Sequence, residues 1–518
     1  MSGDDSSDGA SVDGAPVDGA PITGSDAISG DPGSGPETLA VSALNIGTDE
    51  WVAQHETRTS TGHGVGARVN ALWMSGPAAV RWGLPLLVFV LFPVLVSDGY
   101  LLRIGVNLGL FALLALGLNV VIGYAGLLDL GFVAFYGCGA YAYALLSSDK
   151  LGVHLPTWLS VPAAVLFTAL IGLLVSLPSR RLSGDYLAIV TLFFGQIFTE
   201  LVLAGDAVSL PGASDPVDIT GGANGISGVS GWSVFGFSFN TNRSYYYLVL
   251  FFVVVLVLGL GRISRSRMGR AWRAIGEDPL AAASMTIRVN RLKLLAFVVG
   301  AGIAGLSGTI FSAVQVGVYA SSFDLPMLIL LYAAVILGGS GSLPGTLIGA
   351  AIMSVLPEVL RQPTYSELLF FVGLVAGVLW ILKPKIGALV LAATVAVGFA
   401  INIVLLAVGV PYLSAAEWTQ GVIGELLGRW LFVPQDRLLW GNVAFVLLII
   451  AVAAFSRMHG RAKMWFLPLL LWLSVFVWMV RLSTEASLTR QLVIGATLVV
   501  LMIARPQGIF GKQRVEVL

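Results

Sequence analysis

The chain has 518 residues, of which 56% are hydrophobic and 11% are charged, and its mean hydropathy is +0.87. Soluble domains carry roughly a quarter charged residues, so this composition excludes an ordinary soluble protein and indicates one that lies mostly in lipid. The 29 basic and 29 acidic residues cancel, which excludes nucleic-acid binding through overall positive charge. The single cysteine, Cys138, excludes an internal disulfide, and the four histidines lack metal-ligand spacing, so no metal site is expected.

Residues 1–76 differ in composition from the rest of the chain. They are rich in Gly, Ser, Asp and Ala, and every charged residue before Arg58 is acidic. Such a segment buries too little apolar surface to fold alone. It also lacks the positive and apolar regions of a signal peptide. We therefore expect a disordered, acidic cytoplasmic tail, followed by a first membrane span that acts as the insertion signal.

From residue 77 onward, apolar runs near the ~20 residues needed to cross a bilayer alternate with short polar breaks. This pattern predicts an all-α fold, a polytopic transmembrane helical bundle with about fourteen spans, although the runs from 325 to 360 could instead form a re-entrant pair. The expected spans begin near residues 82, 99, 130, 157, 186, 245, 292, 325, 344, 367, 386, 440, 464 and 489.

Basic residues orient these spans, because Lys and Arg are enriched in short cytoplasmic loops. An even number of spans places both termini on one side, and a cytoplasmic N-terminus then puts most basic residues on the inner side. We therefore expect both termini in the cytoplasm. The inner-side residues are Arg180, Arg181, Arg262, Arg265, Arg267, Arg270, Arg273, Arg288, Arg291, Lys293, Lys383, Lys385, Arg457, Arg461, Lys463, Arg505, Lys512 and Arg514.

The chain carries no sign of ATP hydrolysis or ion coupling. Its only Gly-Lys pair, at 511–512, is followed by Gln and does not form a phosphate loop. The spans lack the paired acids and His relays of ion-coupled carriers. Asp129, Asp185 and Glu200 are the few acidic residues in or near spans, and capping, solvation or reach to the interface would also explain them. We expect no catalytic site and no cofactor in this chain.

The connection 262–293 carries a local signal in its middle. Asp278 can cap the first N–H groups of a helix, Pro279 suits the first helical position, and residues 280–285 can form a short helix of small side chains. Such a helix could seat in a groove of another protein. An ordinary positive loop with a capped turn explains the same spacing, so the local sequence leaves both interpretations open.

Segment 269–287 resembles the EAA-type coupling loop of ABC importer permeases. Further segments resemble the M-type permease subunit of the high-affinity branched-chain amino-acid importer: 116–141, 182–197, 218–227, 293–308 and 335–350. The resemblance implies that the loop docks into an ATPase subunit. The residues implied in this coupling are Gly269, Arg270, Ala274, Glu277, Asp278, Pro279, Ala281, Ala282 and Ile287.

Three residues depart from the family pattern. Gly276 and Pro279 stand where charged residues are often found, and Gln196 occupies a position that is commonly acidic in close relatives. The first two departures concern how the loop fits an ATPase subunit, and the third concerns which substrate is carried.

The same resemblance implies a transporter in the bacterial cytoplasmic (inner) membrane. This chain would pair with an H-type permease subunit, two ABC ATPase subunits that use ATP and Mg, and an extracytoplasmic substrate-binding protein. The cargo would be leucine, isoleucine and valine, and the chain would contact the lipid bilayer but no nucleic acid. A urea or short-amide ABC permease stays open as an alternative, as do an ion-coupled secondary carrier and a membrane-anchored scaffold.

Two further sets of residues are candidates within this scheme. Polar residues in or beside the spans could line the translocation path, or could only bond neighbouring helices and cap their ends. A Gly-rich stretch in the long connection 205–244 could gate the pore or dock the binding protein, or be a plain loop. The path candidates are Asn107, Asn119, Asp129, Tyr136, Tyr141, Asp185 and Tyr186, and the loop candidates are Thr220, Gly221, Gly222, Asn224 and Gly225.

These predictions divide the chain into four parts. The tail, 1–76, precedes a permease core at 77–361. Residues 504–511, ARPQGIFG, resemble the family's terminal motif, which typically follows the core after one more span. Here residues 362–488 intervene with roughly four extra crossings, so we expect an accessory transmembrane insertion there. A terminal span and cytoplasmic tail complete the chain at 489–518.

Overall fold

The computed structural model describes residues 78–179, 185–209, 216–234, 236–361, 363–382, 384–409, 430–458 and 461–482, with short pieces after residue 490. Contacts divide the chain into two units, residues 1–85 and residues 86–518. The expected acidic tail and most of the expected terminal span and tail lie outside the described residues.

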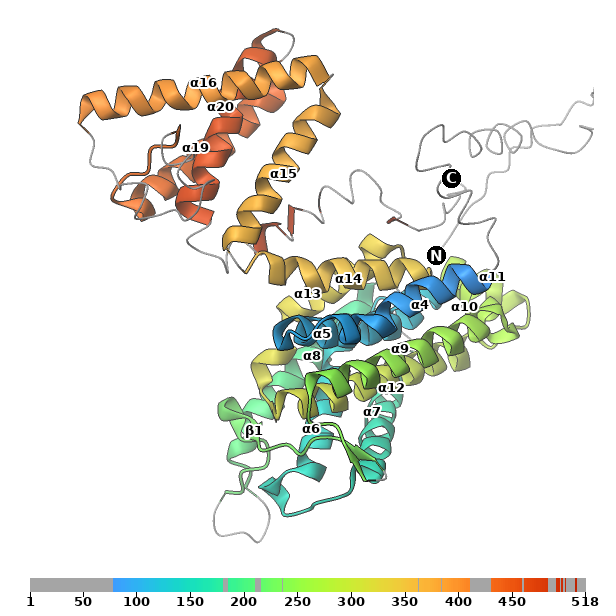
Figure 1. Cartoon of the computed structure of the whole chain (residues 1–518). Helices are drawn as coiled ribbons and strands as arrows, with labels where there is room; N and C mark the ends of the chain where they lie inside the picture. The colour runs from blue at the N-terminus through green and yellow to red at the C-terminus, as the bar shows by residue number, and fades with distance from the viewer. Residues whose placement is uncertain are drawn as a thin grey trace, which may run out of the picture. The chain divides into compact units, whose positions relative to one another are not determined.

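The permease core is built almost entirely from helices (Figure 1). Most are apolar along their whole length, as lipid requires of segments whose backbone groups must bond internally. The helices are α4 (Ala78–Leu95), α5 (Gly99–Asn119), α6 (Phe132–Ser147), α7 (Thr157–Ser179), α8 (Asp185–Leu203), α9 (Asn242–Arg265), α10 (Arg267–Glu277), α11 (Pro279–Ser284), α12 (Val289–Gln315), α13 (Leu325–Gly338) and α14 (Leu343–Val359).

Short elements join these helices. The π-helix η1 (Val120–Tyr124) extends α5 without a break. Two antiparallel pairs, β1 (Ile226–Ser227) with β4 (Gly317–Val318) and β2 (Ser233–Val234) with β3 (Phe237–Ser238), lie in the connections at one end of the core. The remaining pieces are the 3-10 turns η2 (Asp149–Leu151), η3 (Ala204–Asp206), η4 (Gly222–Asn224) and η5 (Ala320–Phe323).

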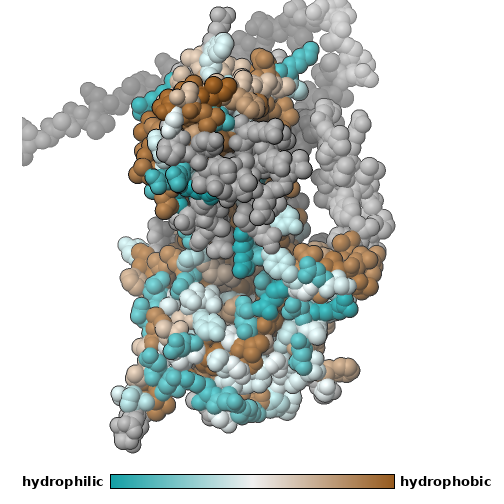
Figure 2. Space-filling view, turned by 60° about the vertical axis from the view of Figure 1, so that its left-hand side comes forward, coloured by the Kyte–Doolittle hydropathy of each residue, from teal (hydrophilic) through white to brown (hydrophobic). Residues whose placement is uncertain are grey.

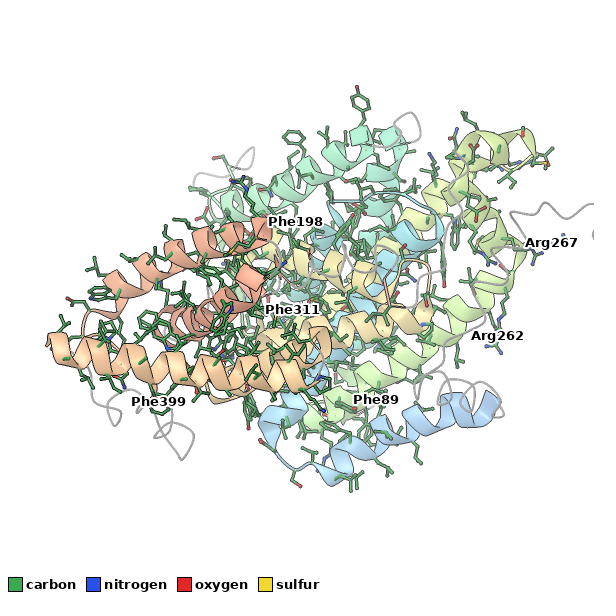
Figure 3. All side chains as sticks on the ribbon, turned by 90° about the horizontal axis from the view of Figure 1, so that it is seen from above. Phe89, Phe198, Arg262, Arg267, Phe311 and Phe399 are labelled. Carbon is green, nitrogen blue, oxygen red and sulfur yellow. The ribbon has the colours of Figure 1, made fainter. Side chains whose placement is uncertain are left out.

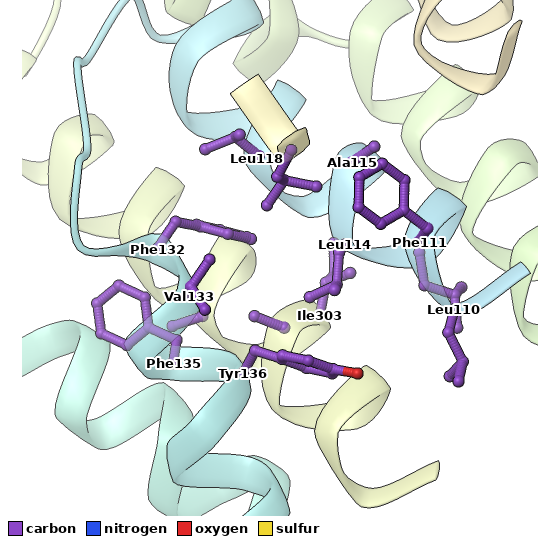
Figure 4. Packing of buried hydrophobic residues seen from close by; sticks show 14 of the residues in the cluster. Leu110, Phe111, Leu114, Ala115, Leu118, Phe132, Val133, Phe135, Tyr136 and Ile303 are labelled. Carbon is purple, nitrogen blue, oxygen red and sulfur yellow. The ribbon is translucent and has the colours of Figure 1, made fainter. Parts of the chain in front are cut away.

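The centre of the core is the contact of α5, α6 and α12. Figure 4 shows Leu114 and Leu118 of α5, Phe132 and Tyr136 of α6, and Ile303 of α12 packed side by side. Glycine permits a close approach, because a Cβ at Gly139 of α6 would lie 2.4 Å from the backbone of α12. Small residues at helix contacts are typical of membrane proteins, where close packing replaces the hydrophobic effect.

Residues after 361 form a second cluster of apolar helices. These are α15 (Pro363–Ile381), α16 (Pro384–Val408), α19 (Arg437–Arg457), α20 (Arg461–Val477) and the π-helix η6 (Trp478–Leu482). They share a buried hydrophobic cluster of their own, in which Phe370 stacks on Trp478 with ring centroids 4.4 Å apart. The structure therefore gives the predicted extra segment 362–488 regular helices, while its role stays a prediction.

Nine helices in the described part of the chain are long and apolar enough to cross a membrane, and four shorter apolar helices accompany them. The helices begin close to thirteen of the predicted starts, whereas the expected span near 489 falls mostly outside the described residues. The structure therefore supports a polytopic helical permease. The predicted number of fourteen spans is not confirmed.

The sides of the core are apolar and one end is polar. On α7 the outward side chains Leu166, Phe167, Leu170 and Leu174 are exposed, as expected of a surface in lipid. In Figure 2 hydrophilic side chains gather at the lower end of the view, which in Figure 1 is the end that carries β1. The helices α9 and α12 join this end to the α10–α11 connection at the opposite end.

Candidate functional site

The α10–α11 connection starts with a capped helix that is fixed to the core. Ser266 caps α10 by accepting a hydrogen bond from the Gly269 N–H at 3.4 Å. Gly269 has no room for a side chain, since a Cβ there would lie 2.2 Å from the Ile263 carbonyl oxygen. Trp272 is fully buried, and its Nε1 donates to the Leu292 carbonyl at the start of α12, at 2.9 Å. The helix α10 is thus tied to both helices that flank the connection.

Asp278 ends α10 and starts α11, as the sequence predicts. Its Oδ1 accepts hydrogen bonds from the N–H groups of Leu280 at 2.8 Å and Ala281 at 3.1 Å, and Pro279 occupies the first turn. A cap of this kind stabilises a helix by about 1 kcal/mol. Because α11 has only six residues, this cap and its neighbours fix its direction.

The helix α11 presents apolar side chains to the outside. Leu280 is 83% exposed and Met285 is 75% exposed, while Ala282 faces inward and is buried. Ala281 and Glu277 are also exposed. The surrounding loop is strongly basic, with arginines at 262 and 265 in the last turn of α9. An apolar pair on a fixed helix with a charged rim is typical of a surface that contacts another protein.

The connection touches the core at a break between two helices. After η1 the chain runs without helix through residues 125–131 before α6 begins. Gly126 in this break has φ +67, and a Cβ there would lie 2.7 Å from the Gly276 Cα of α10. A Cβ at Gly276 would in turn lie 3.1 Å from the Tyr124 carbonyl oxygen. Two glycines therefore allow backbone to rest directly on backbone.

The break also holds a buried carboxyl group. Asp129 is fully buried, and its Oδ1 accepts a hydrogen bond from the Gly131 N–H at 3.0 Å. Tyr332 of α13 donates its hydroxyl to the Asp129 carbonyl, and Thr191 of α8 accepts from the Leu130 N–H at 2.9 Å. The Oδ2 of Asp129 has no partner among the described residues. Helices α8 and α13 are thereby joined through this break.

A second polar contact lies one turn before the break. Asn119, also fully buried, accepts a hydrogen bond from the Gly341 N–H at its Oδ1, at 2.8 Å. Its Nδ2 has no partner in the described part of the chain. The bond fixes the glycine-rich turn between α13 and α14 against η1. The same turn receives the terminal motif, because the Ile509 N–H donates to the Leu337 carbonyl at 2.8 Å.

The predicted path residues do not form one cluster. Asn119, Asp129, Tyr136 and Tyr141 are buried, whereas Asn107 and Tyr186 point outward from α5 and α8. The Tyr136 ring lies 5.2 Å from both Phe311 and Phe323, in an aromatic cluster. Asp185 begins α8, and its side chain lies outside what the structure describes. The path assignment of this set stays a prediction.

The Gly-rich loop candidates form a tight structure at the opposite end. Gly221, Gly222 and Gly225 have φ of +75, +53 and +65, which glycine adopts without strain. Thr220 donates its hydroxyl to the Val202 carbonyl of α8, and Asp218 accepts from the Gly221 N–H at 2.7 Å. Asn224 ends the turn η4 in the same stretch. The loop is therefore anchored to the end of α8.

An ion pair holds this loop to the end of α6. Lys150 lies beside Asp218, and the hydrogen bond from its ammonium group holds the pKa of Asp218 below the usual value. Asp218 is therefore charged over the ordinary pH range. Surface pairs of this kind contribute little to the free energy of folding, so this pair mainly fixes the position of the loop.

One outward surface was not predicted from the sequence. The exposed side of α8 carries Gln196 and Glu200, one turn apart within an apolar span. Their spacing of four residues on one face was the available signal. It could be recognised only with the knowledge of which side of α8 faces its own subunit.

Comparison with known proteins gives the family. The family model described as branched-chain amino acid transport system / permease component matches residues 100–382, more than half of the chain. The permease protein LivM of the high-affinity branched-chain amino acid transport system is 36% identical in Escherichia coli K12 and 35% identical in Salmonella typhimurium, in each case over 323 residues. These matches cover 58% of this chain and 72% of each relative.

A more distant relative is the LivH permease protein of the same system in Salmonella typhimurium, 27% identical over 284 residues, which cover 52% of this chain and 89% of that protein. No solved structure gives a significant match. The family match, at residues 100–382, spans the helices from α5 to α15. The chain belongs to the permease family of branched-chain amino acid transport systems.

Proposed function

We propose that this chain is the M-type permease subunit of an ATP-driven importer of leucine, isoleucine and valine. It pairs with an H-type permease subunit, and the two form the translocation pore in the bacterial inner membrane. Two ABC ATPase subunits bind on the cytoplasmic side and use ATP and Mg, and a substrate-binding protein delivers the amino acid on the outer side. Both termini lie in the cytoplasm. The names of the LivM and LivH relatives support this assignment.

The proposal rests on the structure of the α10–α11 connection. Leu280 and Met285 stand exposed on a capped helix, and the basic residues around them support a cytoplasmic position for the connection by charge bias. An ATPase subunit with an apolar groove buries this pair. The ATPases supply the ATP hydrolysis, for which this chain has no phosphate loop.

The contact between Gly276 and Gly126 gives the coupling a route into the core. When the ATPase subunits close, they displace α11, and α10 moves with it because Asp278 caps one helix directly at the end of the other. The break at 125–131 then moves, since backbone rests on backbone there. Asp129 and Leu130 pass this displacement to α13 and α8 through the bonds to Tyr332 and Thr191 described above.

The loop of Thr220 to Gly225 is the proposed contact for the binding protein. It lies at the end of the core opposite the α10–α11 connection and is anchored to α8 by Thr220. A binding protein that docks there acts on the outer end of α8. The other half of α8 carries Thr191, which accepts a hydrogen bond from the Leu130 N–H. In this proposal, movement of the ATPase subunits and docking of the binding protein therefore both act on α8.

Uptake by the reconstituted complex tests the proposal. The complex of this chain, the H-type permease, both ATPases and the binding protein is placed in proteoliposomes with labelled leucine, isoleucine, valine or urea, with and without ATP. We expect ATP-dependent uptake of the three amino acids and none of urea. Uptake of urea alone would identify the short-amide alternative. Uptake without ATPases, driven by an ion gradient, would identify a secondary carrier.

A further inference from the structure

The helix α8 has two faces of different chemistry. The helix packs on α6, and its inward face carries the buried residues Leu187, Thr191, Phe198 and Val202. Its outward residues recur at the helical spacing of three and four, and in Figure 3 this helix lies at one edge of the core. We name this outward surface the α8 outer face; it consists of Tyr186, Ile189, Phe193, Gln196, Ile197 and Glu200.

The α8 outer face differs from the surfaces that suit lipid. The exposed side of α7 carries only apolar residues at mid-span, among them Leu166, which is 72% exposed. On α8, Gln196 lies ten residues after Tyr186, about 15 Å along a span of about 30 Å, and so near its middle. Glu200 follows one turn later, and both side chains are exposed.

A carboxylate in this position is costly in lipid. Insertion of an acidic residue at a membrane helix centre costs several kcal/mol, and such residues almost always face a bundle interior or a water-filled cavity. Glu200 occupies the middle of the outward arc, between Ile189 and Phe193 in angle, so rotation of α8 cannot hide it without exposing the buried Phe198 face. The outer face of α8 therefore meets water, a polar ligand or another subunit rather than lipid.

We infer that the α8 outer face lines the translocation path and binds the cargo, a zwitterionic amino acid with an aliphatic side chain. Gln196 and Glu200, with Cβ atoms about 5–6 Å apart at a spacing of four residues, accept hydrogen bonds from the α-ammonium group. Phe193 and Ile197 lie on the same face and contact the aliphatic side chain. This inference rests on the proposed function for its cargo, whereas the unsuitability of the α8 outer face for lipid rests on the helix itself.

Thiol accessibility tests the water access without any need for transport. Gln196→Cys and Phe193→Cys are made in a Cys138→Ala background, since Cys138 is the only cysteine of the chain. The assembled complex is treated with a membrane-impermeant, charged thiosulfonate, and labelling is read on this chain after denaturing separation. Leu166→Cys is the matched control, because it lies at mid-span on the lipid-facing side of α7.

We expect both α8 thiols to react, leucine to slow their reaction, and Leu166→Cys to stay unlabelled. Glu200→Gln should also lower ATP-driven leucine uptake about tenfold, with ATPase subunits bound at wild-type yield, since the acceptor of the ammonium group loses its charge. Unreactive α8 thiols in a complex that transports leucine would overturn the inference. Reactive thiols together with no leucine uptake by the Cys138→Ala parent complex would instead overturn the proposed function and leave the path in place.

Discussion

Replacement of Gly126 by alanine should uncouple ATP hydrolysis from transport. Gly126 has φ +67, where an L-residue costs about 1–2 kcal/mol. Its new Cβ would also lie 2.7 Å from the Gly276 Cα, a backbone atom that can move only with α10. Overpacking of this kind costs about a further 1–3 kcal/mol. The chain relieves the overlap by separating the coupling connection from the break, which removes the contact that transmits movement.

Gly152→Ala provides the matched control. Gly152 has φ +65, so it carries the same conformational cost and the same change in the unfolded chain, but nothing lies within 4 Å of its Cβ position. The measured quantity is the number of leucine molecules imported per ATP hydrolysed by the reconstituted complex. We expect this ratio to fall for Gly126→Ala and to remain at the wild-type value for Gly152→Ala. Equal ratios in the two variants would refute the role of the Gly126–Gly276 contact.

Three further substitutions test other parts of the structure. Ala281→Trp should abolish co-purification of the ATPase subunits while membrane insertion stays intact; wild-type yield of the ATPases would contradict a docking role for α11. The Gly222→Trp variant should assemble normally but lose uptake, because the new side chain meets Asp206. The Gly228→Trp variant should retain uptake, because its new side chain enters open space. Equal uptake by the two variants would argue against a role of the loop. Val316→Asn should raise the unfolding temperature of the purified chain by relieving the strain of a β-branched residue at φ +56, worth about 1 kcal/mol; a lower temperature would contradict that strain.

The helices of this protein could be predicted from sequence because lipid imposes a strict length and polarity on them. The expected starts near 99, 157 and 325 coincide with the first residues of α5, α7 and α13. The cap of α11 by Asp278 was also predictable, since the residues that form it are adjacent in sequence. Features set by short-range chemistry can thus be predicted from the order of the residues alone.

The surroundings of the polar residues could not be predicted, because hydropathy does not say which side of a helix faces its own subunit. Asp129, for which solvation or capping was a possible explanation, is fully buried and joins α13 and α8 through its own carbonyl and the adjacent N–H. Glu200, which was expected nearer the outer end of its span, lies on the outward face of α8. The packing of α8 on α6 shows which side of α8 faces outward, and hydropathy alone does not show it.

The helix α12 joins the two functional ends of the core by a single rigid element. It begins five residues after α11 and runs without interruption for 27 residues, about 40 Å at 1.5 Å per residue. At its far end, the Val316 carbonyl accepts hydrogen bonds from the N–H groups of Gly228 and Val229, at 3.1 and 3.3 Å. In the proposed mechanism, a displacement of the α10–α11 connection reaches the 205–244 loop along one covalent helix, which ends at the left-handed Val316. In the proposed mechanism, transport of an amino acid past α8 needs both ends to respond to one event, and α12 connects them through the hydrogen bonds at Val316.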